Sequence, residues 1–313
     1  MQFTKATRKK ARLRLALTGP SGSGKTMAAL MIAKGLGGRV ALLDTEHGSA
    51  SLYAEPMVLP NGTRFDPPEF DALDLSAPYS PERYIEAIHA AEKAGYDTLI
   101  IDSLTHEWSG SGGCLEINDT VAAAKFRGNS WSAWNETTPR HRAFVDAMLQ
   151  SRMHIIGTGR SKTETAQTEG ENGRKQVVKL GMKTEQRDGI EYEFTVVLDL
   201  IHAGHYANAS KDRTGLFAGG EPAPISVATG ERLLAWLESG AEPAPPAQPE
   251  TKGKDMSPKA RAGRIEDGVK AGDATGAAAY LATLPSEEAD SIWAHIAPAI
   301  QDQLTAVWPE VTA

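Results

Sequence analysis

The chain has a single cysteine and lacks any long apolar segment. Cys114 is the one cysteine among 313 residues, so no disulfide can form within the chain. A lone cysteine is typical of a small buried side chain in a reducing compartment. No apolar run approaches the roughly 20 residues that cross a membrane, and no signal-type apolar segment follows the basic N-terminus. These absences exclude a disulfide-rich scaffold and predict a cytoplasmic protein without a membrane partner.

Charge and composition divide the chain into four predicted parts. The first 14 residues hold six Lys and Arg side chains and no acid. Residues 241–313 hold 6 Lys and Arg against 11 Asp and Glu, so most of the net charge of −7 lies there, and the rest of the chain can still carry a basic face. We therefore predict a basic arm (1–14), a large core (15–240), a Pro/Ala-rich linker (241–258) and a small helical module (259–313).

The segment 19–26 has the sequence of a phosphate-binding loop. Apolar residues predict a strand at 13–18 before it and a helix at 27–34 after it. In this context, backbone N–H groups converge on the β-phosphate at a helix N-terminus. Lys25 would reach the β- and γ-phosphates, and the Thr26 hydroxyl would hold Mg²⁺. The sequence thus predicts ATP and Mg²⁺ as cofactors, with a binding set of Gly19, Pro20, Ser21, Gly22, Ser23, Gly24, Lys25, Thr26 and Met27.

Two carboxylates that follow predicted strands complete the expected site. Asp102 ends an apolar strand at 97–102, 77 positions after Lys25, and fits an acid that orients Mg²⁺ through water. A helix-capping aspartate is the alternative. Glu46 follows a strand at 39–44 and fits a base that orients the attacking water, the alternative being an exposed loop acid. Because ligands collect at the carboxyl ends of parallel strands, we expect both acids beside the loop.

The alternation of strands and helices predicts an α/β fold with a mostly parallel sheet covered by helices on both faces. A central strand is expected at 153–158, and an antiparallel pair at 191–200 and 205–210 forms one edge. A helix is expected at 139–150, beginning at its proline. The polar segment 160–188 is expected to be a long loop with room for a hairpin.

Other classes of phosphate-loop protein fit less well. The chain has no Asn-Lys-x-Asp motif for reading guanine, which disfavours a GTPase switch. Its Gly/Ser-rich segment at 109–113 follows the second acidic motif, whereas the signature of transporter ATPases precedes it. A small-molecule kinase stays open as an alternative, although it would need neither Glu46 nor the Lys-x-Arg pair at 211–213.

The motif Leu-Leu-Asp-Thr-Glu-His at 42–47, with Ile-Ile-Asp-Ser at 100–103, resembles the ATPase core of RecA-type recombinases. Closer still are the compact phage ATPases that act in single-strand annealing and recombination. The resemblance covers roughly residues 10–240. It implies that Glu46 is the catalytic carboxylate, that Asp102 is the acid of the Mg²⁺ site, and that a strand ending near Thr158 senses the γ-phosphate. It also implies a bacterial host cytoplasm.

The resemblance further implies an oligomer, either a ring or a filament, in which Lys211 and Arg213 reach the γ-phosphate of a neighbouring subunit. Alternate residues of a strand point the same way, so the two cations can project together. A solvated charged turn is the alternative for this pair. Single-strand-binding and other recombination proteins are further expected partners.

RecA-like proteins bind single-stranded DNA through two loops, and the matching stretches are 105–138 and 160–188. The first interleaves basic and aromatic residues, as stacking on bases requires, and the second holds seven Lys and Arg against five acids, a net charge of +2. The alternatives are core or interface tryptophans and solvated lysines. The predicted DNA-binding residues are Lys125, Arg127, Trp131, Trp134, Arg160, Lys162, Arg174, Lys175 and Lys179. The basic arm can touch DNA or a neighbouring subunit, or it can be a solubilising tail.

Two functions are consistent with these patterns. The first is a DNA-stimulated ATPase that assembles on single strands and promotes annealing or strand exchange. The second is a nucleotide-dependent assembly or loader ATPase, or a helicase-like motor, that serves a protein partner bound by the C-terminal module.

Overall fold

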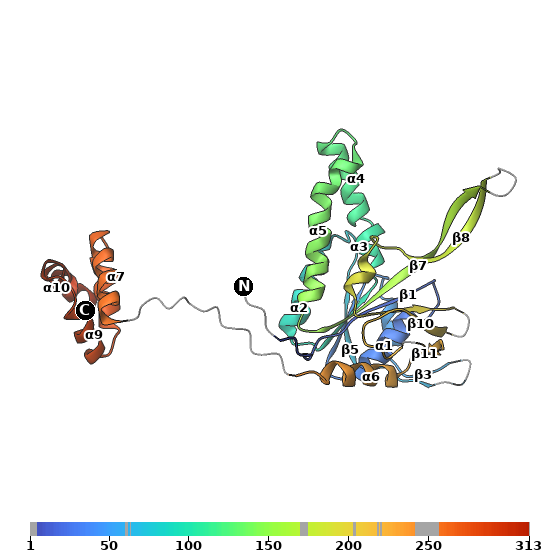
Figure 1. Ribbon diagram of the computed structural model, residues 1–313, viewed down its shortest axis with the longest axis horizontal. Coiled ribbons are helices and arrows are strands. Elements are labelled where there is room, and N and C mark those ends of the chain that lie inside the picture. The colour runs from blue at the N-terminus through green and yellow to red at the C-terminus, as the bar shows by residue number, and fades with distance from the viewer. Residues whose placement is uncertain are drawn as a thin grey trace. The chain divides into compact units, whose positions relative to one another are not determined.

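The computed structural model describes residues 5–59, 62, 64–169, 175–202, 205–217, 219, 221–241 and 257–312. They form two compact units, divided between residues 242 and 243. Figure 1 shows the sheet and its helices in the first unit and a set of short helices in the second.

The first unit is built on a sheet in the order β5-β2-β6-β7-β1-β9-β10-β11. Its parallel strands are β1 (Arg14–Gly19), β2 (Val40–Asp44), β5 (Phe70–Asp74), β6 (Thr98–Asp102), β7 (His154–Glu169) and β9 (Val196–Leu200). Two antiparallel strands, β10 (Tyr206–Asp212) and β11 (Ala223–Pro224), close one edge. A separate pair is formed by β3 (Met57–Val58) and β4 (Arg64–Phe65). This architecture confirms the predicted α/β fold.

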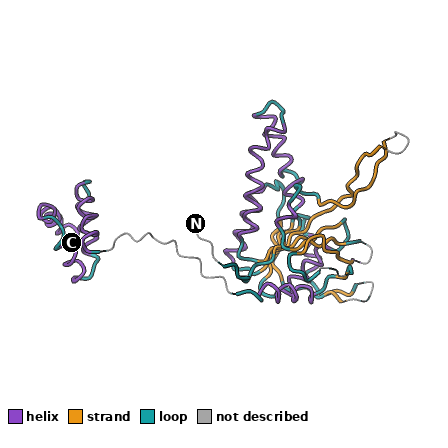
Figure 2. The backbone as a smooth tube through the Cα atoms, viewed as in Figure 1, coloured by secondary structure: helices purple, strands orange, loops and turns teal. Residues whose placement is uncertain are grey.

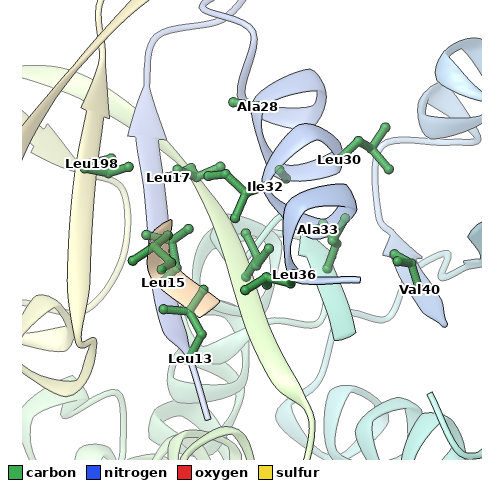
Figure 3. Close-up of a cluster of buried hydrophobic side chains, with 14 of the residues drawn as sticks. Leu13, Leu15, Leu17, Ala28, Leu30, Ile32, Ala33, Leu36, Val40 and Leu198 are labelled. Atoms are coloured by element: carbon green, nitrogen blue, oxygen red, sulfur yellow. The ribbon is translucent and has the colours of Figure 1, made fainter. Parts of the chain in front are cut away.

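Helices cover both faces of the sheet, so its central strands are buried on both sides. Leu13, Leu15 and Leu17 pack on one face against α1 (Lys25–Leu36) and α6 (Val227–Glu238). Figure 3 shows these leucines directed at the apolar side of α1. Ala16 points to the other face, which is covered by α2 (Pro81–Ala94) and α5 (Ser130–Gln150). A parallel sheet sandwiched in this way holds its strand ends, and the side chains on them, in fixed positions.

The segment predicted as a DNA-binding loop at 105–138 is helical. It forms α3 (Thr105–Ser109), α4 (Cys114–Lys125) and the first part of α5, and α4 and α5 pack side by side as a helical hairpin (Figure 2). The prediction that a helix begins at Pro139 was wrong, because the Asn129 side chain caps the helix by accepting from the Ser132 amide (3.1 Å). Packing of α5 against α2 and α4 keeps the proline inside a continuous helix.

The segment 160–188 carries the hairpin for which the sequence left room. β7 continues past the sheet and pairs with β8 (Lys175–Thr184) in antiparallel register. The stretch 191–193, predicted as the start of a strand, is a 3₁₀ helix, η2 (Ile190–Glu193), and a second one, η1, spans Ser49–Tyr53. β9 begins only at Val196, where its residues enter the core.

Part of the basic arm is built into the first unit. The Arg8 guanidinium lies over the Trp236 ring, 4.2 Å from its centroid. Arg14 is the first residue of β1 and is buried, and its guanidinium donates to backbone carbonyls at the end of α5, including Leu149 O (3.0 Å) and Met153 O (2.8 Å). Arg14 therefore closes a helix terminus rather than facing DNA or solvent.

The second unit consists of α7 (Pro258–Lys270), α8 (Ala274–Ala282), α9 (Ser286–Trp293) and α10 (Pro298–Thr312). Ile265, Leu281, Ile292 and Leu304 form its core. Most of the predicted linker, residues 242–256, lies outside the described residues. None of the helices in the described part of the chain is both long and apolar enough to span a bilayer.

Candidate active site

The phosphate-binding loop joins the end of β1 to the start of α1. Gly24 is the residue before the helix and has a left-handed backbone (φ 89°), as does Gly22 (φ 74°). Side chains at these positions would be strained, so glycine is required for the turn. The Ala28 amide already donates to Gly24 O (2.9 Å), which starts the helix directly at the loop. The first amides of α1 therefore point at the space where a phosphate group binds.

The Lys25 ammonium lies folded over this loop. Its Nζ donates to Gly19 O (3.0 Å) and Pro20 O (2.9 Å). Burial lowers the Lys25 pKa, while Asp102 and Glu46 raise it and Arg160 lowers it. These three groups therefore share one electrostatic field with the ammonium, and carbonyls hold the cation where phosphate oxygens can replace them.

Asp102 is held between the phosphate-binding loop and the central strand. Thr26 donates from Oγ1 to Asp102 Oδ2 (2.6 Å), and Thr158 donates to Oδ1 (2.5 Å). The contacts form because β7 lies between β1 and β6, so Thr158 stands beside both motifs. Burial raises the Asp102 pKa, and the two hydroxyls oppose that shift. Thr158, which the resemblance places near the γ-phosphate, is fully buried and orients this carboxylate.

Glu46 lies two residues after the end of β2, where it forms an ion pair with Arg160. The Arg160 guanidinium donates to Glu46 Oε1 from Nη2 (2.8 Å) and Nε (3.1 Å). The turn that carries Glu46 is fixed by Asp44, whose carboxylate accepts from the amides of Glu46 (2.6 Å) and Ala50 (2.8 Å). Glu46 therefore occupies a defined position on the same edge of the sheet as Asp102.

Arg160, which the sequence placed in a candidate DNA-binding loop, lies at the candidate active site. It aligns with Gly19 in the pairing of β7 with β1, at the start of the phosphate-binding loop. The sequence feature that could have indicated this location is the position of Arg160 two residues after Thr158, because alternate residues of a strand share a face.

Helix α3 connects this site to the rest of the unit, a connection that sequence reasoning missed. His106 contacts Thr45 (Nδ1 to Oγ1, 2.6 Å), and its ring stacks on Tyr79 at 5.0 Å. The Thr105 hydroxyl accepts from the Arg160 amide (2.9 Å). Burial lowers the His106 pKa, and Arg160 lowers it further. α3 thus contacts the residue before Glu46 and the backbone of its ion-pair partner.

Two histidines that the sequence did not single out lie over the phosphate-binding loop. His205 contacts Ser23 O through Nδ1 (3.1 Å) and has a left-handed backbone (φ 53°). The His202 ring lies 6.2 Å from that of His205. Both follow β9, the strand that flanks β1 on the side away from β7.

Lys211 and Arg213 lie near the opposite end of the sheet's strands from their own phosphate-binding loop. Lys211 pairs with Val197 near the start of β9, whereas the loop lies at the other end of that strand. Both cations donate to Tyr192 O, Lys211 from Nζ (2.5 Å) and Arg213 from Nη2 (2.9 Å). They point together, as the sequence indicated, but they do not reach the nucleotide site of the same chain.

The predicted DNA-binding residues fall into separate groups. Lys125 pairs with Glu136 (2.6 Å), and Arg127 follows it at the end of the helical hairpin. Trp134 stacks on Trp108, whereas Trp131 is 87% exposed. The remaining candidates belong to the β-hairpin region. Lys162, Lys175 and Lys179 lie on its strands, and the structure does not describe their side chains. Arg174 lies outside the described residues.

A buried polar cluster lies beneath α3. Glu107, Cys114 and His141 place their donor atoms within 4.8 Å of one another. The Glu107 carboxylate accepts from the Cys114 thiol (3.1 Å) and from Gln186 Nε2 (3.2 Å), and it contacts His141 Nδ1 (3.1 Å). Burial and the neighbouring carboxylate raise the Cys114 pKa, which keeps the thiol protonated as a donor. The cluster is thus a satisfied hydrogen-bond network, and Cys114 is the buried residue that the sequence predicted.

Comparison with models of known protein families identifies a match over most of the first unit. A family model described as an AAA domain matches residues 11–234, well over half of the chain. The matched range contains the phosphate-binding loop, both candidate carboxylates and the Lys211–Arg213 pair. No curated protein matched the chain.

Proposed function

The chain belongs to the AAA domain family of P-loop ATPases, and from this premise we propose that it acts on single-stranded DNA in phage-type annealing and recombination. The observation that carries the nucleotide chemistry is the convergence of Lys25, Asp102, Glu46 and Arg160 at one edge of the sheet. Four charged groups from four different elements meet beside a loop whose backbone favours phosphate.

The oxygen donors at this site fit a magnesium ion. Thr26 Oγ1 and Asp102 Oδ2 are 2.6 Å apart, and hydroxyl and carboxylate oxygens are the ligands that Mg²⁺ prefers. Thr26 would hold the ion directly and Asp102 would do so through water. When bound, the ion supplies neutralisation of charge on the β- and γ-phosphates.

Hydrolysis in this arrangement depends mainly on positioning. Glu46 orients a water molecule for in-line attack on the γ-phosphorus, the bond to the β-phosphate oxygen breaks, and ADP and phosphate leave. Lys25 and the loop amides stabilise the charge that develops on the phosphate oxygens. Glu46→Gln should therefore retain ATP binding and lose roughly 100-fold or more in turnover.

The proposed action on DNA is supported by the strand that joins the active site to the β-hairpin. β7 carries Thr158 and Arg160 at the nucleotide site and continues into its antiparallel pairing with β8. Lys162, Lys175 and Lys179 lie on these two strands. A strand of DNA held by the hairpin would thus act on the same β-strand that positions Asp102 and Glu46.

The test is ATP turnover with and without single-stranded DNA. We expect stimulation that falls steeply with salt, because phosphate contacts release counterions. The matched variant replaces Lys162, Lys175 and Lys179 with Ala and should keep basal turnover while losing stimulation. Unchanged turnover and undetectable DNA binding at low salt with ATP would remove the DNA proposal and leave the ATPase intact.

A second candidate function is an assembly or loader ATPase that serves a protein partner. It is favoured by the second unit, whose four helices enclose a core of their own. Deleting residues 241–313 distinguishes the two functions. The DNA proposal predicts that DNA-stimulated turnover largely survives, whereas the loader proposal predicts that partner-dependent activity is lost.

A further inference from the structure

A cavity of about 530 Å³ lies on the helical part of the first unit, away from the phosphate-binding loop. Trp108 of α3 and Trp131 and Trp134 of α5 line it, together with Arg142 of α5 and Arg187, which follows β8. Three different segments of the chain therefore converge on it, although Trp108 and Arg187 are far apart in the sequence.

Two of the three tryptophans in this cavity stack on each other, and the third is exposed. Trp108 and Trp134 stack with centroids 5.5 Å apart and an interplanar angle of 16°. Trp131 lies one helical turn before Trp134, so both share a face of α5. The Trp131 side chain, however, is 87% exposed. An exposed tryptophan beside a stacked pair offers a flat apolar face to a planar ligand, and such faces mark binding sites.

The charge of the lining is positive. The lining includes Arg142 and Arg187, and no carboxylate is among the described residues that form it. The Arg187 guanidinium is oriented by Thr138 Oγ1 (3.2 Å) and lies 5.8 Å from the Trp134 centroid. Planar aromatic faces beside guanidinium groups fit an occupant that combines a flat ring with an anion, as an unpaired nucleotide does.

We propose that this cavity binds a nucleobase of single-stranded DNA, with the base stacked on Trp131 and its phosphates facing Arg142 and Arg187. The inference rests on the proposed function, because it names where part of the DNA binds. It also separates this site from the β-hairpin, on whose strands Lys162, Lys175 and Lys179 lie.

The site connects to the nucleotide through α3. Trp108 lies two residues after His106, which contacts the residue next to Glu46. On the other side, Arg187 follows Gln186, which donates to Leu104 O (2.9 Å) and Glu107 (3.2 Å). A nucleotide held in the cavity therefore lies beside α3 itself, through Trp108, and beside the segment that supports the start of α3, through Arg187.

The experiment compares two oligonucleotides of equal length, one of thymidines and one whose sugars carry no bases, by fluorescence anisotropy with an ATP analogue. Both have the same phosphates, so a difference in affinity reports contacts to bases. The wild-type protein should bind the thymidine strand about tenfold more tightly. Trp131→Ala should bind both strands equally, and Trp131→Phe should keep a preference. Arg142→Ala should weaken binding of both strands by a similar factor.

Val58→Ala is the matched control, since it removes exposed apolar surface elsewhere, and it should keep the preference. A Trp131→Ala protein with wild-type preference would overturn the inference and leave the cavity to a protein partner. Equal wild-type binding of both strands would also overturn it while keeping the DNA proposal. Binding of neither strand would remove the DNA proposal itself.

Discussion

Arg160 and Glu46 form an ion pair, 2.8 Å between Nη2 and Oε1, although they are 114 residues apart and Glu46 follows β2, which is not a neighbour of β7, the strand of Arg160. The pair places a cation and the candidate catalytic carboxylate together at the mouth of the phosphate-binding loop. We expect the γ-phosphate of ATP to compete with Glu46 for the same guanidinium, which would link nucleotide binding to release of the carboxylate.

Replacing Arg160 should slow hydrolysis. Arg160→Ala removes a cation that can stabilise charge on the transferring phosphoryl group, so we expect phosphate release to fall by roughly tenfold or more. Arg160→Lys should recover part of the rate, since it keeps the charge but not the planar fork. Arg152→Ala, at an exposed position after α5, is the control. A faster Arg160→Ala enzyme would show instead that Arg160 restrains Glu46.

Lys211 and Arg213 should act on a neighbouring subunit, because the structure places them away from their own loop. Neither Lys211→Ala nor Glu46→Ala should hydrolyse ATP efficiently alone. Mixing the two should restore activity, since some interfaces then combine an intact Glu46 with an intact Lys211. ATP turnover across a series of mixing ratios measures this, and an absence of recovery at every ratio would contradict a role in trans.

Arg14 should contribute to stability rather than to binding. Its guanidinium satisfies four backbone carbonyls, those of Leu13, Leu149, Ser151 and Met153. Burial lowers its pKa to about 10, so it stays charged at neutral pH. Arg14→Met would leave these acceptors unpaired, and we expect a loss of about 3 kcal/mol in the free energy of unfolding, measured in urea. Arg39→Met, which removes an exposed hydrogen bond to Ala94 O and a cation–π contact with Tyr96, should cost only about 1 kcal/mol.

His154 should make stability depend on pH. The Leu13 amide donates to its Nδ1 (3.0 Å), and burial together with Arg12 and Arg14 lowers its pKa to about 4. The unfolded state, with a pKa near 6.5, binds the proton more readily. The stabilisation is therefore complete above pH 6.5 and is lost as the pH falls towards 4, by at most about 3 kcal/mol.

Urea unfolding between pH 7 and pH 4 measures this effect. His154→Asn keeps an acceptor for the Leu13 amide but cannot be protonated, so its stability should fall less over the same range. An identical pH dependence in the two proteins would assign the loss to other groups.

The sequence determined the local features of this protein, because local chemistry encodes them. The phosphate-binding loop needs glycines at fixed offsets between a strand and a helix. The apolar strands that precede Asp102 and Glu46 indicate where these two acids lie. Sequence also predicted the layered fold, since strands buried on both faces require helices on both sides. Glu46 as the base and Asp102 in a magnesium site stay predictions that the geometry makes testable.

Only the tertiary structure decided which side chains meet. Strand order placed β7 between β1 and β6, which turned Thr158 towards Asp102 and Arg160 towards Glu46. Packing of α5 against α2 and α4 made a helix of a segment that was expected to be a loop, and it brought Trp108, Trp131 and Arg187 to one cavity. These outcomes depend on contacts between residues far apart in the chain, and such contacts leave no periodic signal in the sequence.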